Sequence, residues 1–268
     1  MGNESVVSPH IDQLSREGTL FCNGYSSTPS STPARAGLLT GMSPWHHGML
    51  GYGRVAEEYR YEMPAMLKEQ GYYTFGIGKM HWFPQKALHG FRATLIDESG
   101  RAESKDFISD YRLWLQLQMP GGDPTGIGWN EHGAGIYKLP EELHPTAWTG
   151  KMACELIRNY DNESPLFLKV SFARPHSPYD PPQRLLDEYS EKEIPVPSIG
   201  DWCGGYAALL DPAKADKDAP FANFGVEYAR NSRKHYYANV TFFAYFSGSF
   251  RCTGSAGYGR TFSIGADG

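Results

Sequence analysis

Ser31, Pro33 and Arg35 stand at alternate positions and are the residues whose types most directly suggest chemistry. Proline is typical of the first turn of a helix, so we expect Ser31 just ahead of a helix, beside unpaired backbone N–H groups and the positive end of the helix dipole. Such a place suits an anion, and Arg35 can reach back to a tetrahedral oxyanion or to the side chain of residue 31. The plain alternative is an N-cap serine followed by a solvated arginine.

Further polar residues follow apolar runs of strand length. Lys79 and His81 come directly after the run at 72–78, and His176 stands among prolines after the run at 165–172. We expect all of them at the carboxyl edge of a sheet, where the sites of parallel α/β folds form. A solvated lysine or histidine at a strand end is the alternative.

The elements that must position these residues alternate between helix and strand. Apolar spacing and Pro or Gly at the ends predict the helices, and aromatic or β-branched runs predict the strands. The alternation predicts an α/β fold with a mainly parallel sheet flanked by helices. Residues 90–145, rich in Gly and Pro, are expected to have little regular structure. The predicted helices are 8–18, 33–39, 63–70, 144–160 and 227–240, and the predicted strands are 19–25, 72–78 and 165–172.

Composition argues against several classes of function. The formal net charge is -5 and no Lys/Arg cluster occurs, so we expect no nucleic-acid partner. No apolar run is long enough to span a bilayer, and the first residues do not resemble a signal peptide. The cysteines Cys22, Cys154, Cys203 and Cys252 are widely spaced and form no C-x-x-C pair, which favours buried free thiols.

Residues 31–41 resemble the signature of the type I, formylglycine-dependent sulfatases, a branch of the alkaline phosphatase superfamily. That signature has Cys or Ser, then Pro and Arg at alternate positions, then Thr-Gly, and Ser31 matches its serine-type variant. Residues 78–81 are similar to the family's G-K-x-H motif, and residues 173–182 resemble its third motif. The resemblance covers roughly 8–241 and implies an alkaline-phosphatase-like fold.

The resemblance implies a hydrolase of sulfate esters. Ser31 would be the precursor of formylglycine, made by a sulfatase-maturing enzyme, and its hydrated aldehyde would be the nucleophile. Arg35 and Lys79 would bind the sulfate, His81 would support the formylglycine, and His176 would protonate the leaving group. A sulfated carbohydrate or an aryl sulfate is the expected substrate. The full-length family leads us to expect a periplasmic or secreted protein.

The sequence departs from the family pattern at the metal. The family's calcium is held by the modified residue, here Ser31, by an Asp-Asp pair after the first strand and by a late Asp with Asn or His. Neither acidic set occurs in this sequence. We therefore expect an incomplete catalytic domain at 1–242, truncated at both ends, followed by an irregular tail at 243–268. Weak calcium binding and little or no activity are the expected consequences.

Alternatives to a sulfatase remain open at this stage. One is a phosphate or phosphonate ester hydrolase of the same superfamily that uses residue 31 directly, and another is a non-catalytic fragment. The sequence says little about the identity of the substrate. Aromatic residues of the irregular segments could form a platform for a sugar ring or could be buried: Trp82, Trp129, Tyr137 and Trp202.

Overall fold

The structure, a computed structural model, describes residues 2–128, 131, 133–161, 163–206 and 223–252. The chain divides into two compact units. The first unit comprises Met1–Gly18, Asp123–Ala147 and Arg174–Gly248. The second comprises Thr19–Gly122, Trp148–Ala173 and Ser249–Gly268.

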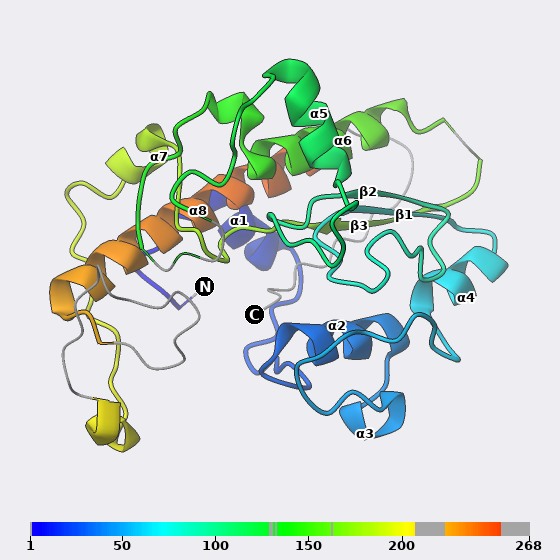
Figure 1. The fold of residues 1–268 in the computed structure, drawn as a ribbon, viewed down its shortest axis with the longest axis horizontal. Helices are drawn as coiled ribbons and strands as arrows, with labels where there is room; N and C mark the ends of the chain where they lie inside the picture. The colour runs from blue at the N-terminus through cyan, green and yellow to red at the C-terminus, as the bar shows by residue number, and fades with distance from the viewer. Residues whose placement is uncertain (1, 129–130, 132, 162, 207–222, 253–268) are drawn as a thin grey trace. The chain divides into compact units, whose positions relative to one another are not determined.

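A parallel sheet organises the second unit. Among the described residues it has three strands in the order β2–β1–β3, namely β1 (Tyr73–Gly78), β2 (Ala93–Ile96) and β3 (Leu166–Ser171). They lie side by side in Figure 1, and Gly78 pairs with Ile96 on one side and with Ser171 on the other. The strands therefore end at a common edge, and the predicted mainly parallel α/β fold is confirmed.

Helices accompany this sheet in the second unit, and one of them, α2, carries part of the site. They are α2 (Ser31–Thr40), α3 (Pro44–His47), α4 (Met63–Glu69), α5 (Asp110–Gln118) and most of α6 (Pro145–Asn159). α4 contacts β1 and α5 contacts β2. The apolar face of α2, with Ala36 and Leu39, packs in one buried cluster with Met80, Trp82 and Phe91. This burial fixes the start of α2 beside the chain that leaves β1.

The segment at 90–145 is more regular than predicted. It contains β2, α5 and a short 3-10 helix, Glu141–Leu143. The strand predicted at 19–25 does not form in the described structure, where Phe21 and Tyr25 are 82% and 88% exposed. Strand propensity acts through pairing and burial, and this segment has neither there.

The first unit is mainly helical in its described part. It contains α1 (Pro9–Glu17), α7 (Gln183–Asp187), a 3-10 helix (Asp201–Tyr206) and nearly all of α8 (Val226–Cys252). Tyr189 packs against Phe242 of α8, and its hydroxyl lies 2.6 Å from the hydroxyl of Thr241. α8 continues to Cys252, so residues 243–252 are helical where an irregular tail was predicted. The remainder of that tail lies outside the described residues, and the boundary at 242 stays a prediction.

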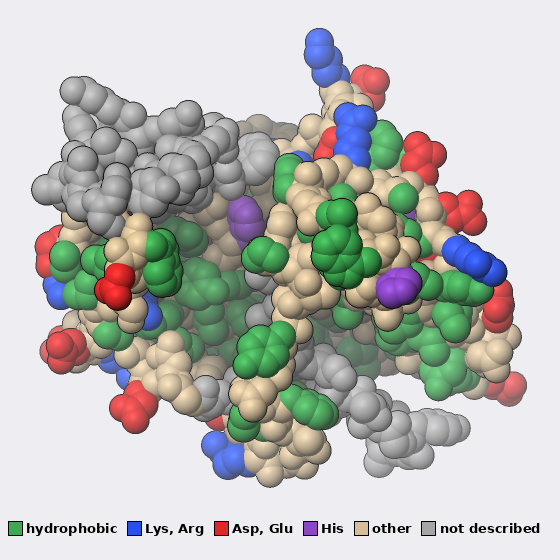
Figure 2. Space-filling model, turned by 90° about the horizontal axis from the view of Figure 1, so that it is seen from below, with side chains coloured by type: hydrophobic (Ala, Val, Ile, Leu, Met, Phe, Trp, Pro, Cys, Tyr) green, Lys and Arg blue, Asp and Glu red, His purple; other side chains and the backbone are tan. Residues whose placement is uncertain are grey.

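Surface charge and side-chain burial can be compared with what the sequence predicted. On the face seen in Figure 2, acidic and basic side chains are interspersed. No helix within the described ranges has the length and apolarity needed to cross a membrane. Cys154 is buried as predicted, whereas Cys22 is exposed. Among the aromatic residues considered for a platform, Trp82 and Tyr137 are buried, Trp202 is 82% exposed, and Trp129 lies outside the described residues.

Candidate active site

Ser31 is the first residue of α2 rather than the residue ahead of it. The N-cap is Ser30, whose extended backbone (φ -107, ψ 143) leads into the helix and whose side chain makes no capping hydrogen bond. Ser31 is half-buried at a helix start, where first-turn N–H groups lack intrahelical acceptors and the helix dipole is positive. The location suits a bound anion, and the role of Ser31 in binding one stays a prediction.

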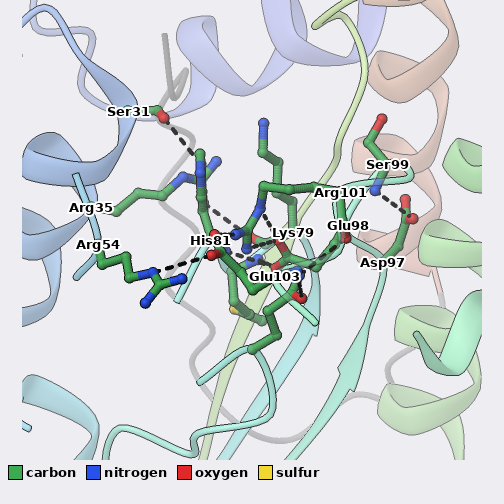
Figure 3. Close-up of polar contacts among 12 residues, drawn as sticks. Ser31, Arg35, Arg54, Lys79, His81, Asp97, Glu98, Ser99, Arg101 and Glu103 are labelled. Atoms are coloured by element: carbon green, nitrogen blue, oxygen red, sulfur yellow. Dashed lines mark hydrogen bonds and ion pairs between the residues drawn. The ribbon is translucent and has the colours of Figure 1, made fainter. Parts of the chain in front are cut away.

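His81 lies next to Ser31. Its Nδ1 is 3.1 Å from Ser31 Oγ, a hydrogen-bond distance, as Figure 3 shows. His81 follows β1 on a turn that begins at Gly78, and both residues have positive φ, 59° and 96° respectively. Because the imidazole is buried, the alternative of a solvated histidine is wrong.

Arg35 is buried one turn after the start of α2 and joins the helix to the sheet. Its guanidinium donates to the carbonyl oxygen of Lys79 at 3.0 Å and to Ser171 Oγ at 3.4 Å. The backbone N–H of Lys79 in turn donates to the carbonyl oxygen of Ser171 at 2.8 Å. Arg35 therefore holds the ends of β1 and β3 in place, and the alternative of a solvated arginine is wrong.

Lys79 is buried at the same edge of the sheet. Burial is the largest of the effects that together lower the pKa of its ammonium to about 8; the positive charges of Arg35 and Arg101 act in the same direction, while Glu98 and Asp97 oppose them. A desolvated ammonium beside a second cation favours the binding of an anion.

Sequence reasoning missed a network of charged side chains after β2. Arg101 binds both Glu98 and Glu103, and Glu103 also lies 3.4 Å from Arg54 (Figure 3). An acid at the carboxyl end of a parallel strand is a recognisable signal, but β2 itself was not predicted. Beside this network a cavity of about 230 Å³ is bordered by His81, Tyr52 and Arg54.

A larger cavity, about 490 Å³, lies in the first unit between residues 189–194 and α8. None of the predicted site residues lines it. Its size alone therefore does not connect it with the chemistry.

His176 belongs to the first unit, on the loop that follows β3. The loop is braced by a buried ion pair, in which Arg174 donates to both carboxylate oxygens of Asp180 at 2.8 and 3.0 Å. His176 is exposed between these residues, and its Nδ1 donates to the carbonyl oxygen of Ser177 at 2.9 Å. The structure brings Ser31, Arg35, Lys79 and His81 together in the second unit, and the role of His176 stays a prediction.

A calcium site does not fit the residues around Ser31. Its neighbours are a histidine and cations, and the nearby carboxylate of Glu98 is already bound by Arg101 and by backbone N–H groups. Across the described part of the chain, no group of three or more His, Cys, Asp or Glu side chains is arranged to hold a metal ion. Calcium prefers six or more oxygen ligands, which this set does not offer.

Comparison with known proteins identifies the family. The family model described as Sulfatase matches residues 1–247. The arylsulfatase of Clostridium perfringens is 34% identical over 216 residues, which cover 75% of this chain and 45% of the relative. The choline-sulfatase of Rhizobium meliloti is 30% identical over 257 residues, covering 88% and 46%. This chain thus spans about half the length of the curated relatives it matches.

The fold agrees with this assignment. The crystal structure of the phosphonate monoester hydrolase of Agrobacterium radiobacter superposes with a TM-score of 0.69 at 20% identity, covering 94% of this chain and 55% of the other. That similarity concerns the fold alone. Sequence and architecture together lead to one conclusion: this chain belongs to the sulfatase family and has an alkaline-phosphatase-like fold.

Proposed function

We propose that this chain carries part of the active site of a sulfatase, which hydrolyses sulfate esters, and that Ser31 is the residue converted to formylglycine. One observation carries the proposal: Ser31 begins α2 at 3.1 Å from His81. Arg35 and Lys79 lie in the same unit and supply the positive charge that a sulfate needs. Belonging to the sulfatase family supports this reading of the geometry.

The residues of the chain divide the chemistry among them. The ammonium of Lys79 and the start of α2 attract the sulfate oxygens, and Arg35 keeps Lys79 in place through its backbone carbonyl. His81 Nδ1 can accept the proton of a hydroxyl at residue 31. When hydrated, the formylglycine aldehyde supplies a hydroxyl that attacks sulfur and a second hydroxyl that releases the sulfate. No step of the proposal requires calcium.

We propose that His176 is the general acid that donates a proton to the leaving alcohol. Because its Nδ1 donates to the Ser177 carbonyl, the proton that it transfers would come from Nε2. Bracing of the loop by Arg174 and Asp180 supports a fixed orientation of the imidazole.

The substrate is proposed only as a class. The cavity of about 230 Å³ is lined by His81, Tyr52 and Arg54. An aromatic ring and a cation in its lining are consistent with an aryl sulfate or a sulfated carbohydrate as the substrate. The similarity to an arylsulfatase favours the aryl sulfate as the first compound to test.

A phosphate or phosphonate ester hydrolase is the second candidate. Sulfate and phosphate esters are both tetrahedral anions, and the same helix start and cations suit either one. The observation that supports this candidate is the fold that the chain shares with a phosphonate monoester hydrolase.

The test begins with the modification itself. The chain is co-expressed with a sulfatase-maturing enzyme, and the peptide that contains Ser31 is weighed by mass spectrometry. Conversion of serine to the aldehyde removes two hydrogens, which pass to the electron acceptor of the maturing enzyme. We expect this loss in the wild-type chain and in Ser30→Ala, the matched control, because the Ser30 side chain makes no capping hydrogen bond.

Hydrolysis is then measured with an aryl sulfate and the matching aryl phosphate. We expect Ser31→Ala to abolish sulfate release while Ser30→Ala retains it. Equal rates for these variants would refute the assignment of Ser31, and preference for the phosphate would favour the second candidate. A chain that is modified but inactive on both esters would indicate a non-catalytic fragment.

A further inference from the structure

Glu98 is a buried carboxylate whose contacts converge on the turn that carries Lys79 and His81. It follows β2 and is 2% exposed. Its Oε1 accepts the backbone N–H of Met80 at 3.0 Å and that of His81 at 2.8 Å. Figure 3 shows Glu98 directly beside this turn. One oxygen therefore satisfies consecutive N–H groups of the chain leaving β1.

Arg101 fixes the other end of this carboxylate. Its Nε donates to Glu98 Oε2 at 3.0 Å, and its terminal nitrogens bind Glu98 and Glu103. Charge-assisted hydrogen bonds of this kind are about twice as strong as neutral ones, so the orientation of Glu98 is well defined.

The turn needs such support because of its backbone. His81 has φ 59°. This left-handed backbone conformation is unfavourable in free energy for an L residue that has a side chain. The same conformation brings its Nδ1 to 3.1 Å from Ser31 Oγ. A contact that stabilises this backbone therefore also determines where the imidazole points.

We propose that Glu98 is a positioning residue of this site: its carboxylate, oriented by Arg101, holds the backbone of Met80 and His81 so that the imidazole faces Ser31. The catalytic meaning of this role rests on the proposed function, whereas the hold on the turn does not. Glu98 touches neither Ser31 nor the His81 ring in the contacts described, so it acts through the backbone.

Electrostatics adds a second consequence for Lys79. The charged groups that face its ammonium are Arg35 from α2 and Asp97, Glu98 and Arg101 from the chain after β2. The two carboxylates raise the pKa of Lys79 and the two guanidinium groups lower it, against the larger effect of burial. Glu98 therefore helps Lys79 to remain charged.

The experiment compares the full chain with Glu98→Gln, Glu98→Asp and the matched control Glu103→Gln. Glu103 binds the same arginine but neither amide. Amide hydrogen exchange at Met80 and His81 is followed by NMR, with the β1 amide of Ile77 as an internal report on the fold. The pKa of Lys79 is read from the pH dependence of its acylation, quantified by mass spectrometry.

We expect exchange at Met80 and His81 to become roughly tenfold faster in Glu98→Gln, because a charged acceptor is replaced by a neutral one. The pKa of Lys79 should fall below about 8 in this variant. Glu98→Asp keeps the charge but is too short to reach both amides, so exchange should accelerate without the fall in pKa. Glu103→Gln should match the wild-type chain in both measurements.

Unchanged exchange at Met80 and His81 in Glu98→Gln would overturn the proposal, as would an equal change in Glu103→Gln. Neither measurement depends on turnover. If both move as expected while Ser31→Ala hydrolyses sulfate esters as fast as the wild-type chain, the proposed function fails and the role of Glu98 in the turn stands.

Discussion

Gly78 is the residue at which a single methyl group should most directly disturb the candidate site. A Cβ at this position would lie 2.0 Å from the carbonyl oxygen of Ser171 and 2.9 Å from its carbonyl carbon, and the backbone has φ 96°. Backbone atoms cannot move aside as a flexible side chain can. Gly78→Ala must therefore separate β1 from β3 at the point where Lys79 begins.

The control is Gly71→Ala, where φ is 88° but no atom lies within 4 Å of the added Cβ. Both variants carry the strain of an unfavourable backbone conformation, roughly 1–3 kcal/mol. Only Gly78→Ala also disturbs the hydrogen bond from Lys79 N–H to Ser171, at 2.8 Å, and that from Asp97 N–H to Gly78, at 3.2 Å. At about 0.5–1.5 kcal/mol for each bond, we expect Gly78→Ala to be less stable than Gly71→Ala by about 2 kcal/mol.

Urea unfolding followed by circular dichroism measures this difference, from midpoints compared at equal slopes. A fluorescence melt gives an independent ranking of the variants. Equal destabilisation by both substitutions would show that β1 and β3 separate at no cost, and the close approach at Gly78 would then not constrain the site.

Three further predictions concern buried groups. Asp180→Ala leaves the buried guanidinium of Arg174 without its carboxylate and should lower the free energy of unfolding by about 3–5 kcal/mol. Its control, Glu141→Ala, breaks the exposed pair with Arg184 and should lower the free energy of unfolding by about 1 kcal/mol or less. Urea titration measures both losses, and equal losses would contradict the argument from burial. Leu185→Ala, at a fully buried position, should cost about 2–5 kcal/mol, against about 0.5 kcal/mol or less for Leu38→Ala, which is 52% exposed; similar midpoints would count against the described core. The pKa of Lys79 lies near 8, below its ordinary value of 10.5, so between these two pH values the unfolded chain binds more protons than the folded chain. The stability of the wild-type chain relative to Lys79→Met should therefore rise with pH in this range, by up to about 1.4 kcal/mol per pH unit. Lys79→Met should accordingly be the more stable protein below pH 8, and parallel pH profiles of the two proteins would contradict the burial of a charged ammonium.

The sequence predicted those parts of the fold that have strong local signals. Proline near the start and glycine at the end mark α1, and the aromatic and β-branched run of β1 distinguishes it from its surroundings. β2 escaped prediction because only Ala93–Ile96 are paired, and such a short strand is identified by its neighbour β1 rather than by its own composition. The segment 19–25 shows the reverse case, in which strand-forming residues find no partner strand in the described structure.

The candidate site could be predicted from the sequence only as far as its motifs extend. Ser31, Arg35, Lys79 and His81 stand in patterns that can be recognised along the chain, and the structure places them in one unit. Glu98 belongs to no such pattern, since its significance comes from reaching the amides of Met80 and His81 across a strand pairing. Contacts made through tertiary structure leave little trace in a single sequence.

The strand order β2–β1–β3 has a consequence for how such a site can diversify. The chain passes from the middle strand to one neighbour and then crosses to the other, which makes the carboxyl end of β1 a topological switch point of the sheet. The turn that leaves β1 is bonded on one side to Ser171 at the end of β3 and on the other side to Glu98, which follows β2. The loops that leave the outer strands can therefore change in length and sequence beyond these anchoring residues while the turn that carries Lys79 and His81 keeps its place.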